Sequence, residues 1–442
     1  MLLLELNEFN LHLLRAAAAH EPLPHVQRLL RLPRSVIFTQ DRDETGFLEP
    51  WVQWVSIHTG EPSPNHAVKH LGDLPHTRHK FIWETLDQRG ITTGIWGVMN
   101  GARRESKLCT FFLPDPWTFS EQAYPATLAP LLAMPRYLAR NYLNISEAKV
   151  ARLLLGFVWT SVRSLGLCDF TASLGLLIRG VRQFGMRPLV FITWFEYLST
   201  LAFLRYRAGH RPAFSLLFLN ILAHVQHHYW TAGVKGVTPE IRFAIRAVDR
   251  LLGRIFAAIG EATPLIVTNA LSQKNTKGER TWILYRQKDP RAFVDAIGLG
   301  AATVEPLMTY DAHVFFHTAA ERSAAVMLLS EAQVSGRRVF EVEADNGNPL
   351  KLFYRINFTD ELPVDAVLEV NGRRLPFFAW FTMVVKRTGR HIRAGTVFAR
   401  GIALPAKLEN HRLHDIIGRY FYAGDAAAQM GDESPRLAST AT

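Results

Sequence analysis

Residues 2–10 read LLLELNEFN, a short apolar run that ends in polar residues. The run has the length and composition of a buried strand, and the residues after it are typical of a loop at the carboxyl end of that strand. In open α/β sheets, ligands bind at this end of the strands. The opening stretch therefore predicts a parallel sheet whose first strand ends at a binding site.

The same pattern returns along the chain and extends the predicted sheet. Residues 92–98, 214–220 and 264–268 are further apolar runs, and helical patterns such as residues 241–259 separate them. A continuous apolar run is typical of a strand that is buried on both faces. We therefore predict an α/β fold, with a mainly parallel sheet sandwiched by helices.

Two segments depart from this alternation. Residues 119–207 are long apolar-periodic helices punctuated by prolines, which predicts a helical insertion or cap. Residues 281–386 mix short strands with one helix, which predicts a small α+β subdomain. The core would then comprise residues 1–118, 208–280 and 387–425, and residues 426–442 would form a small, polar and flexible tail.

The charge balance limits the class of partner. The 442 residues include 50 Lys and Arg against 39 Asp and Glu, a formal net charge of +11. This balance favours an anionic partner such as a phosphate, a nucleic acid or an acidic lipid surface. The sequence carries no specific signal for nucleic acid, and the substrate we expect is an anionic small molecule or glycan. The two cysteines, Cys109 and Cys168, are too few for a disulfide framework or a Cys-rich zinc module, which indicates a reducing compartment.

The apolar stretches bear on location. The longest, residues 188–204, is interrupted by Glu196 and is shorter than the ~20 residues that span a bilayer. The first residues lack the basic region of a signal peptide, so we expect a cytoplasmic protein. The apolar, arginine-bearing insertion either lies on the inner face of a membrane or packs as a cap over the cleft.

Histidines cluster in two places. His224 and His228 follow Asn220 and would share one face of a helix, because they are four residues apart. His411 opens a second cluster together with His414. Imidazoles with oxygen ligands suit one divalent ion such as Zn or Mn. The alternative is that these histidines cap helices or pack on aromatic side chains.

Other polar residues allow two interpretations each. Glu5 would share a sheet face with Asn7, and Asn7 either contributes to a site or caps the following helix. Glu49 is either a catalytic base or a solvated loop charge. The chain contains no P-loop, GxGxxG, GxSxG or HExxH motif.

The order of these motifs resembles that of the alkaline phosphatase superfamily, in particular its type I phosphodiesterase/nucleotide pyrophosphatase branch. The family's first strand, its Pro-Asn-Leu-x-x-Leu helix and its Thr-Gly segment resemble residues 2–7, 23–29 and 59–66. Its Asp-x-x-x-His motif falls on residues 220–224, its Ser-Asp-His-Gly strand end on residues 268–271, and its last histidine on His411. The likeness covers residues 2–100, 210–272 and 395–420.

The resemblance is incomplete at the residues that carry the family's chemistry. The position of its nucleophile falls on Pro50, which has no nucleophilic atom, and the histidine of its Asp-His pair falls on Ala270. Its metal-ligand aspartates fall on Asn7, Asn220 and Asn269. Amides bind dications far more weakly than carboxylates, so the resemblance implies that the metal position with Asn7 and Asn269 is degenerate and empty.

The other metal position would keep Asn220, His224 and His411. The resemblance then implies a divergent hydrolase or transferase that acts on a phosphate- or sulfate-ester substrate with at most one bound metal. Glu49 would be its candidate base and His228 a candidate helper. The alternative is a catalytically inactive family member that binds a phosphorylated ligand or a protein partner.

Overall fold

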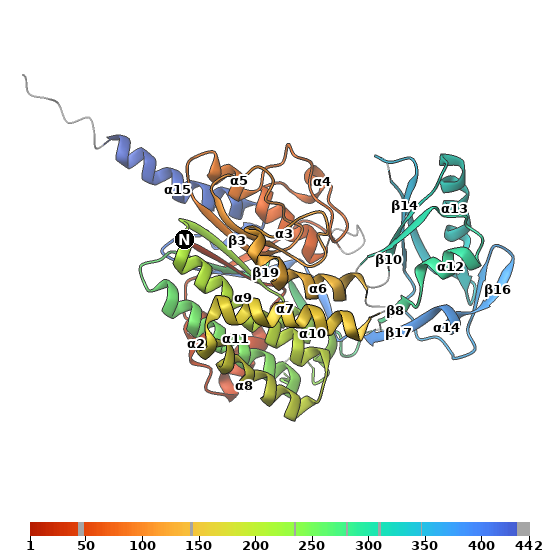
Figure 1. Cartoon of the computed structure of the whole chain (residues 1–442), viewed down its shortest axis with the longest axis horizontal. Helices are drawn as coiled ribbons and strands as arrows, with labels where there is room; N and C mark the ends of the chain where they lie inside the picture. The colour runs from red at the N-terminus through yellow and green to blue at the C-terminus, as the bar shows by residue number, and fades with distance from the viewer. Residues whose placement is uncertain are drawn as a thin grey trace, which may run out of the picture.

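The computed structural model describes residues 1–42, 48–141, 145–233, 236–279, 282–307, 311–345 and 347–430. A large body of helices around a central sheet lies beside a smaller α+β lobe (Figure 1). The α/β class, the helical insertion and the small α+β subdomain predicted from the sequence are confirmed.

The central sheet has eight strands, in the order β20-β2-β19-β6-β1-β5-β3-β4. Only β19 runs antiparallel to its neighbours, so the sheet is mainly parallel, as predicted. The strands are β1 (Leu2–Leu6), β2 (Arg34–Phe38), β3 (Thr93–Val98), β4 (Cys109–Pro114), β5 (Phe214–Leu219), β6 (Leu265–Thr268), β19 (Ala394–Arg400) and β20 (Lys407–Glu409).

The opening apolar run forms the middle of this sheet. Every residue of β1 and β5 is buried, and the two strands pair in parallel from Leu2 beside Ser215 to Leu6 beside Leu219. β6 flanks β1 on its other side. Because the three strands run in the same direction, their carboxyl ends meet at one edge of the sheet.

Helices cover both faces of the sheet. Leu2 and Leu4 belong to one hydrophobic core and Leu3 to another, because successive strand residues point to opposite faces. The first core includes α1 (Leu11–His20), α2 (Pro24–Leu30), α10 (Ile221–Tyr229) and α11 (Pro239–Ile259), and the second includes α3 (Pro50–Thr59), α5 (Ile82–Asp87) and α15 (Arg412–Met430). A short helix, α4 (Ser63–His66), follows α3.

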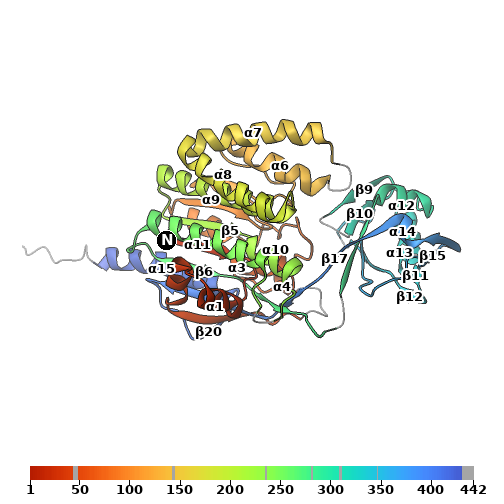
Figure 2. The same cartoon turned by 90° about the horizontal axis from the view of Figure 1, so that it is seen from below.

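The insertion consists of α6 (Ala129–Arg140), α7 (Glu147–Leu165), α8 (Leu167–Phe184) and α9 (Pro188–His210), after a short turn, η2 (Ala126–Leu128). Leu198 and Phe203 of α9 share the first core with β1 and β5, so the insertion packs on the body (Figure 2). In the part of the chain that the structure describes, no helix is long and apolar enough to cross a bilayer.

The lobe has a hydrophobic core of its own, built from buried residues between Ile283 and Phe381. It contains the helices α12 (Pro290–Ala296), α13 (Ala319–Glu331) and α14 (Phe377–Trp380) and the strands β8 (Ile283–Gln287), β9 (Thr303–Pro306), β10 (Asp311–Phe315), β11 (Gln333–Val334), β12 (Arg337–Arg338), β13 (Phe340–Ala344), β14 (Lys351–Ile356), β15 (Val367–Val370), β16 (Arg373–Pro376) and β17 (Phe381–Lys386). A two-stranded ribbon, β7 (Ser272–Asn275) with β18 (Gly389–Ile392), lies close to the carboxyl end of β6.

The predicted tail of residues 426–442 falls partly outside the described residues. Residues 426–430 continue α15, so the helix extends further than the sequence pattern indicates. Residues 431–442 are not among those that the structure describes.

Candidate metal centre

The carboxyl ends of β1 and β5 meet through two asparagine side chains. Asn7 Nδ2 donates a hydrogen bond to Asn220 Oδ1 over 2.7 Å, and Trp54 Nε1 of α3 donates one to Asn7 Oδ1 over 2.8 Å. The predicted meeting of these strand ends is therefore present. The alternative that Asn7 caps the following helix is wrong, because Asn10 is the N-cap of α1 and accepts the Leu13 N–H.

Glu8 follows Asn7 with an unusual backbone conformation. Its φ of +55° lies in the left-handed region, which non-glycine residues rarely adopt. The side chain is 3% exposed, and Asn7 Nδ2 donates to its Oε1 atom over 2.9 Å. The turn thus presents a buried carboxylate at the edge of the sheet where ligands bind in such folds.

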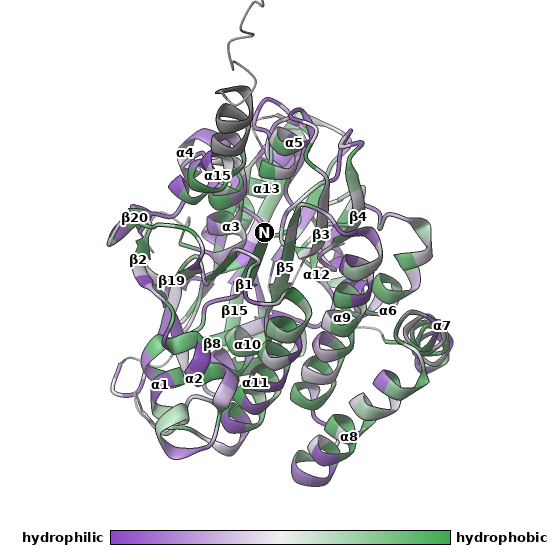
Figure 3. Ribbon diagram, turned by 90° about the vertical axis from the view of Figure 1, so that its left-hand side faces the viewer, coloured by the Kyte–Doolittle hydropathy of each residue, from purple (hydrophilic) through white to green (hydrophobic). Residues whose placement is uncertain are grey.

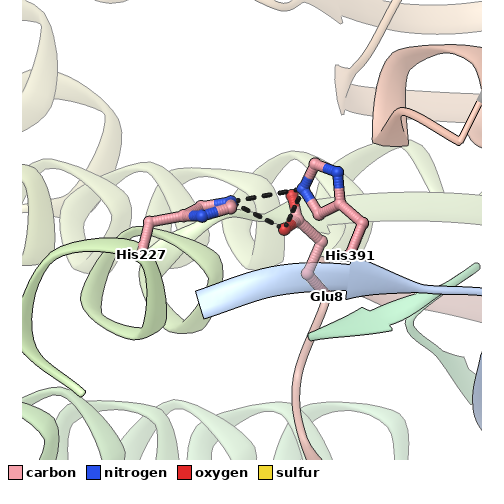
Figure 4. Close-up of side chains that lie close together, drawn as sticks. All are labelled: Glu8, His227 and His391. Atoms are coloured by element: carbon pink, nitrogen blue, oxygen red, sulfur yellow. Dashed lines mark hydrogen bonds and ion pairs between the residues drawn. The ribbon is translucent and has the colours of Figure 1, made fainter. Parts of the chain in front are cut away.

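Two histidines from distant elements meet the other oxygen of this carboxylate. Glu8 Oε2 lies 2.9 Å from His227 Nε2 of α10 and 2.9 Å from His391 Nε2 of β18, and the two Nε2 atoms are 3.3 Å apart (Figure 4). Within the described ranges, this is the one group of three or more His, Cys, Asp or Glu whose ligand atoms all lie within 4.8 Å of one another.

The other nitrogen of each ring fixes its orientation. His227 Nδ1 lies 3.3 Å from the Gly389 carbonyl oxygen, and His391 Nδ1 lies 3.1 Å from the Leu48 carbonyl oxygen and 3.3 Å from Glu49 Oε2. These oxygens only accept hydrogen bonds, so each Nδ1 atom is placed to donate when the Nε2 atom of its ring binds an ion. With the ring proton on Nδ1, the lone pair of Nε2 is free for an ion that lies between the ring and Glu8.

The charges of the group follow from its burial and its contacts. Burial alone would lower the pKa of His391, but the carboxylates of Glu8 and Glu49 outweigh it and raise that pKa to about 10. Burial lowers the pKa of His227, although the Glu8 carboxylate opposes this shift. Burial also opposes ionisation of Glu8, but the two imidazoles hold its pKa well below the usual range. Without an ion, His391 and Glu8 form an ion pair, and His227 lies against the same carboxylate oxygen.

The same three atoms fit a divalent ion. A tetrahedral ion with bonds of about 2.0–2.1 Å separates its ligand atoms by roughly 3.3 Å. The observed separations of 2.9, 2.9 and 3.3 Å are close to this value. Two imidazoles with one carboxylate are a known ligand set of catalytic zinc, and ligand histidines usually donate through their second nitrogen, as both are placed to do here. His227, whose side chain is 18% exposed, is the most exposed of the three ligands.

The predicted histidines lie elsewhere in the structure. The rings of His224 and His228 contact each other with their centroids 4.6 Å apart, and burial lowers their pKa values to about 4 and about 3. His224 Nε2 is buried without a hydrogen-bond partner. His411 Nε2 lies 3.6 Å from Glu409 Oε2. Neither His224 nor His411 belongs to the three-residue group, so their shared metal ion stays a prediction.

The other predicted positions have structural contacts. Asn269 Nδ2 donates to the Phe9 carbonyl and its Oδ1 accepts the Thr396 N–H, so both ends of the amide are occupied by backbone. Pro50 is the buried first residue of α3. Glu49 precedes it, and its contact with His391 lowers its pKa although burial opposes this.

The sequence pattern singles out neither His391 nor His227. The four-residue spacing selects His224 and His228, whereas His227, which lies between them in the sequence, is the histidine that contacts Glu8. His391 is 164 residues from His227 and has no motif around it. Glu8, a carboxylate directly after the first strand, was the available signal.

Comparison with known proteins gives structural matches only. No family model and no curated protein matches the chain. Phosphonoacetate hydrolase from Sinorhizobium meliloti 1021 is 16% identical, with 96% of this chain and 95% of that chain covered and a TM-score of 0.43. Human ectonucleotide pyrophosphatase/phosphodiesterase 5 is 12% identical, and the match covers 96% of this chain and 94% of that chain with a TM-score of 0.44. A mutant of TAB5 alkaline phosphatase with Mg bound is 12% identical, and the match covers 95% of this chain and 96% of that chain with a TM-score of 0.40.

These matches concern the fold alone. At these identities and TM-scores the likeness carries no argument about activity.

Proposed function

We propose that the chain is a hydrolase that binds one divalent ion, Zn²⁺ or Mn²⁺, on Glu8, His227 and His391 and acts on an anionic phosphate or sulfate ester. One observation carries the proposal: Glu8 Oε2 and the two Nε2 atoms lie 2.9–3.3 Å from one another, and the Nδ1 atom of each ring faces a carbonyl or carboxylate oxygen that can accept its N–H.

A divalent ion on this set would polarise an ester oxygen and lower the pKa of a water molecule toward neutrality. Such chemistry would replace the nucleophile that is missing at Pro50. Glu49 accepts a hydrogen bond from His391 Nδ1, so we assign it the role of a positioning residue for that ring rather than of the base. Gln273 Nε2 and Asn7 Nδ2 each donate to one oxygen of Glu8 and orient the carboxylate.

The charges around the group support an anionic substrate. The guanidinium of Arg387 acts electrostatically on both His227 and Glu49, and that of Arg355 acts on Glu49. Arg387 also lines a cavity of about 260 Å³ together with Lys277 and Lys386, beside the Thr388 backbone N–H that donates to the His227 carbonyl. A positive potential next to the metal position raises the local concentration of an anionic ester.

The test is turnover of aryl phosphate, phosphodiester and sulfate esters by the zinc- or manganese-loaded protein. We expect His227→Ala and Glu8→Gln to lower kcat/KM by roughly a hundredfold or more, because each removes a ligand. His224→Ala, on the same helix, is the matched control and should retain turnover. If His224→Ala and His411→Ala lose turnover while His227→Ala keeps it, the ion instead uses the Asn220, His224 and His411 position and the proposed centre is wrong.

A binding protein without turnover is the second candidate. It is favoured by Gln273 Nε2, which lies 2.6 Å from Glu8 Oε2 and competes with an ion for that oxygen. Protein that takes up no metal, binds phosphate esters in calorimetry and hydrolyses none of them would support this candidate.

A further inference from the structure

The outer helix of the insertion exposes large apolar side chains. Leu155 and Trp159 of α7 are 71% and 68% exposed, and Leu167 at the start of α8 is 66% exposed. Leu155 and Trp159 are four residues apart and are therefore neighbours on the helix surface. Scattered single residues of this kind need no explanation, whereas adjacent ones form a patch.

The patch belongs to a defined face of α7. Arg152, Leu155, Trp159 and Arg163 follow one another at helical spacing, so the two apolar side chains lie between two arginines. We call these four residues the α7 stripe. The opposite side of the helix is packed, with Phe157, Ser161 and Leu165 buried. The centroid of the Phe157 ring lies 4.7 Å from that of Phe195 of α9. The stripe therefore faces away from the core of the insertion.

The position of α7 leaves this face accessible. In Figure 2 the helix lies at the outer edge of the insertion, on the side away from the sheet. Figure 3 looks nearly along the axis of α7 and shows the helix at the periphery of the molecule.

The surrounding charge is basic. Residues 145–187 contain six arginines and lysines and two acidic residues, and the acidic Asp169 pairs with Arg254. Arg179 and Arg182 extend the positive charge along the exposed side of α8. Apolar and aromatic side chains flanked by arginines are the composition of helices that lie in the interface of an anionic bilayer.

We propose that the α7 stripe docks on an anionic membrane surface, independently of the function proposed above. Trp159 and Leu155 would enter the boundary between headgroups and acyl chains, and Arg152 and Arg163 would contact the lipid phosphates. A second copy of the chain is a poorer occupant, because a two-fold contact through this face would bring its arginines against the same arginines of the other copy.

The chain offers a natural reporter for this contact. Cys168 is exposed and directly follows Leu167, whereas Cys109 is buried and its thiol pKa is raised to about 11 by that burial. An environment-sensitive fluorophore will therefore label Cys168 selectively in the full-length protein. We expect its emission to shift to the blue with vesicles of phosphatidylcholine and phosphatidylglycerol, and to stay unchanged with phosphatidylcholine alone.

Two variants test the stripe itself. Leu155→Ser/Trp159→Ser should weaken partitioning onto anionic vesicles at least about tenfold, since it removes the apolar groups that insert. Arg152→Glu/Arg163→Glu should weaken partitioning by at least about twentyfold, since each of the two basic residues contributes about fivefold. The matched controls are Met327→Ser, which is 64% exposed on α13, and the exposed Arg338→Glu on β12. Circular dichroism of each variant verifies the fold.

Three outcomes would overturn the proposal. They are no binding to anionic vesicles, equal binding to neutral vesicles, and binding that the stripe variants leave unchanged. A dimer in sedimentation that Leu155→Ser/Trp159→Ser abolishes would also overturn it, because the occupant would then be a second copy.

Discussion

Asn7 Nδ2 donates to Asn220 Oδ1 over 2.7 Å and joins the carboxyl ends of two adjacent strands that are 213 residues apart in the chain. Two carboxylates at this distance would repel each other unless a cation or a proton lay between them. Two amides instead form a hydrogen bond and need no ion. The negative charge at this edge of the sheet lies one residue after Asn7, at Glu8. The metal centre that we propose is therefore built on Glu8 and not on the two asparagines.

The asparagine pair predicts an asymmetry between two substitutions. Asn7→Asp removes both hydrogen bonds that Asn7 Nδ2 donates, to Glu8 and to Asn220, and it places a carboxylate beside Glu8. We expect a loss of about 1–3 kcal/mol in the free energy of unfolding, measured by urea titration at pH 7. Asn220→Asp keeps the acceptor for Asn7 and should cost less. An equal or larger loss for Asn220→Asp would contradict this interpretation.

The pair of Glu5 and His58 lies inside the second core. His58 Nε2 is 2.7 Å from Glu5 Oε1, both side chains are fully buried, and burial raises the pKa of Glu5. Removing one partner leaves the other unpaired, so His58→Ala should cost about 3–5 kcal/mol. The double variant Glu5→Leu/His58→Leu should cost less than His58→Ala alone. The check is a double-mutant cycle by chemical unfolding with Glu5→Leu, His58→Leu and their double variant. A double variant that costs the sum of these two single variants would refute the pairing energy.

Glu196 of α9 predicts a pH dependence of stability. It accepts the backbone N–H groups of Asn220 at 2.8 Å and Ile221 at 2.9 Å, at the start of α10. Burial raises its pKa from 4.5 to about 8, although these hydrogen bonds oppose the shift. Because the folded pKa is the higher one, the protonated form favours folding. Its contribution is complete below pH 4.5 and is lost as the pH rises through 8.

Glu196→Gln is uncharged throughout and should lack this loss. We expect the free energy of unfolding of the wild type, relative to Glu196→Gln, to fall between pH 5 and pH 9. Urea titrations of both proteins at pH 5, 7 and 9 measure it. Parallel pH profiles would mean that the carboxyl group is not buried as described.

The central sheet was predictable because a continuous apolar run is stable only as a strand that is buried on both of its faces. Residues 2–6 and 214–219 could only be stable as interior strands, and parallel neighbours bring their ends together, so the proximity of Asn7 and Asn220 followed. The helical insertion followed from its periodicity in the same way.

The three-residue centre was not predictable for reasons of local geometry. Strand alternation would place Glu8 on the face opposite to Asn7, but its left-handed φ of +55° redirects the side chain. Helical spacing groups His224 with His228 but does not determine which side of α10 meets the sheet edge. His391 is positioned by the pairing of β18 with β7, which depends on contacts between distant segments and leaves no periodic signal.

The central claim is that an ion binds to Glu8, His227 and His391, and equilibrium dialysis with elemental analysis tests it most directly. After dialysis against Zn²⁺ or Mn²⁺, we expect about one equivalent of metal in the wild type and in His224→Ala, and none in His227→Ala or His391→Ala. Circular dichroism ensures that all variants are folded. A wild type that holds no metal, or a His227→Ala variant that keeps its equivalent while His224→Ala loses it, would contradict the account.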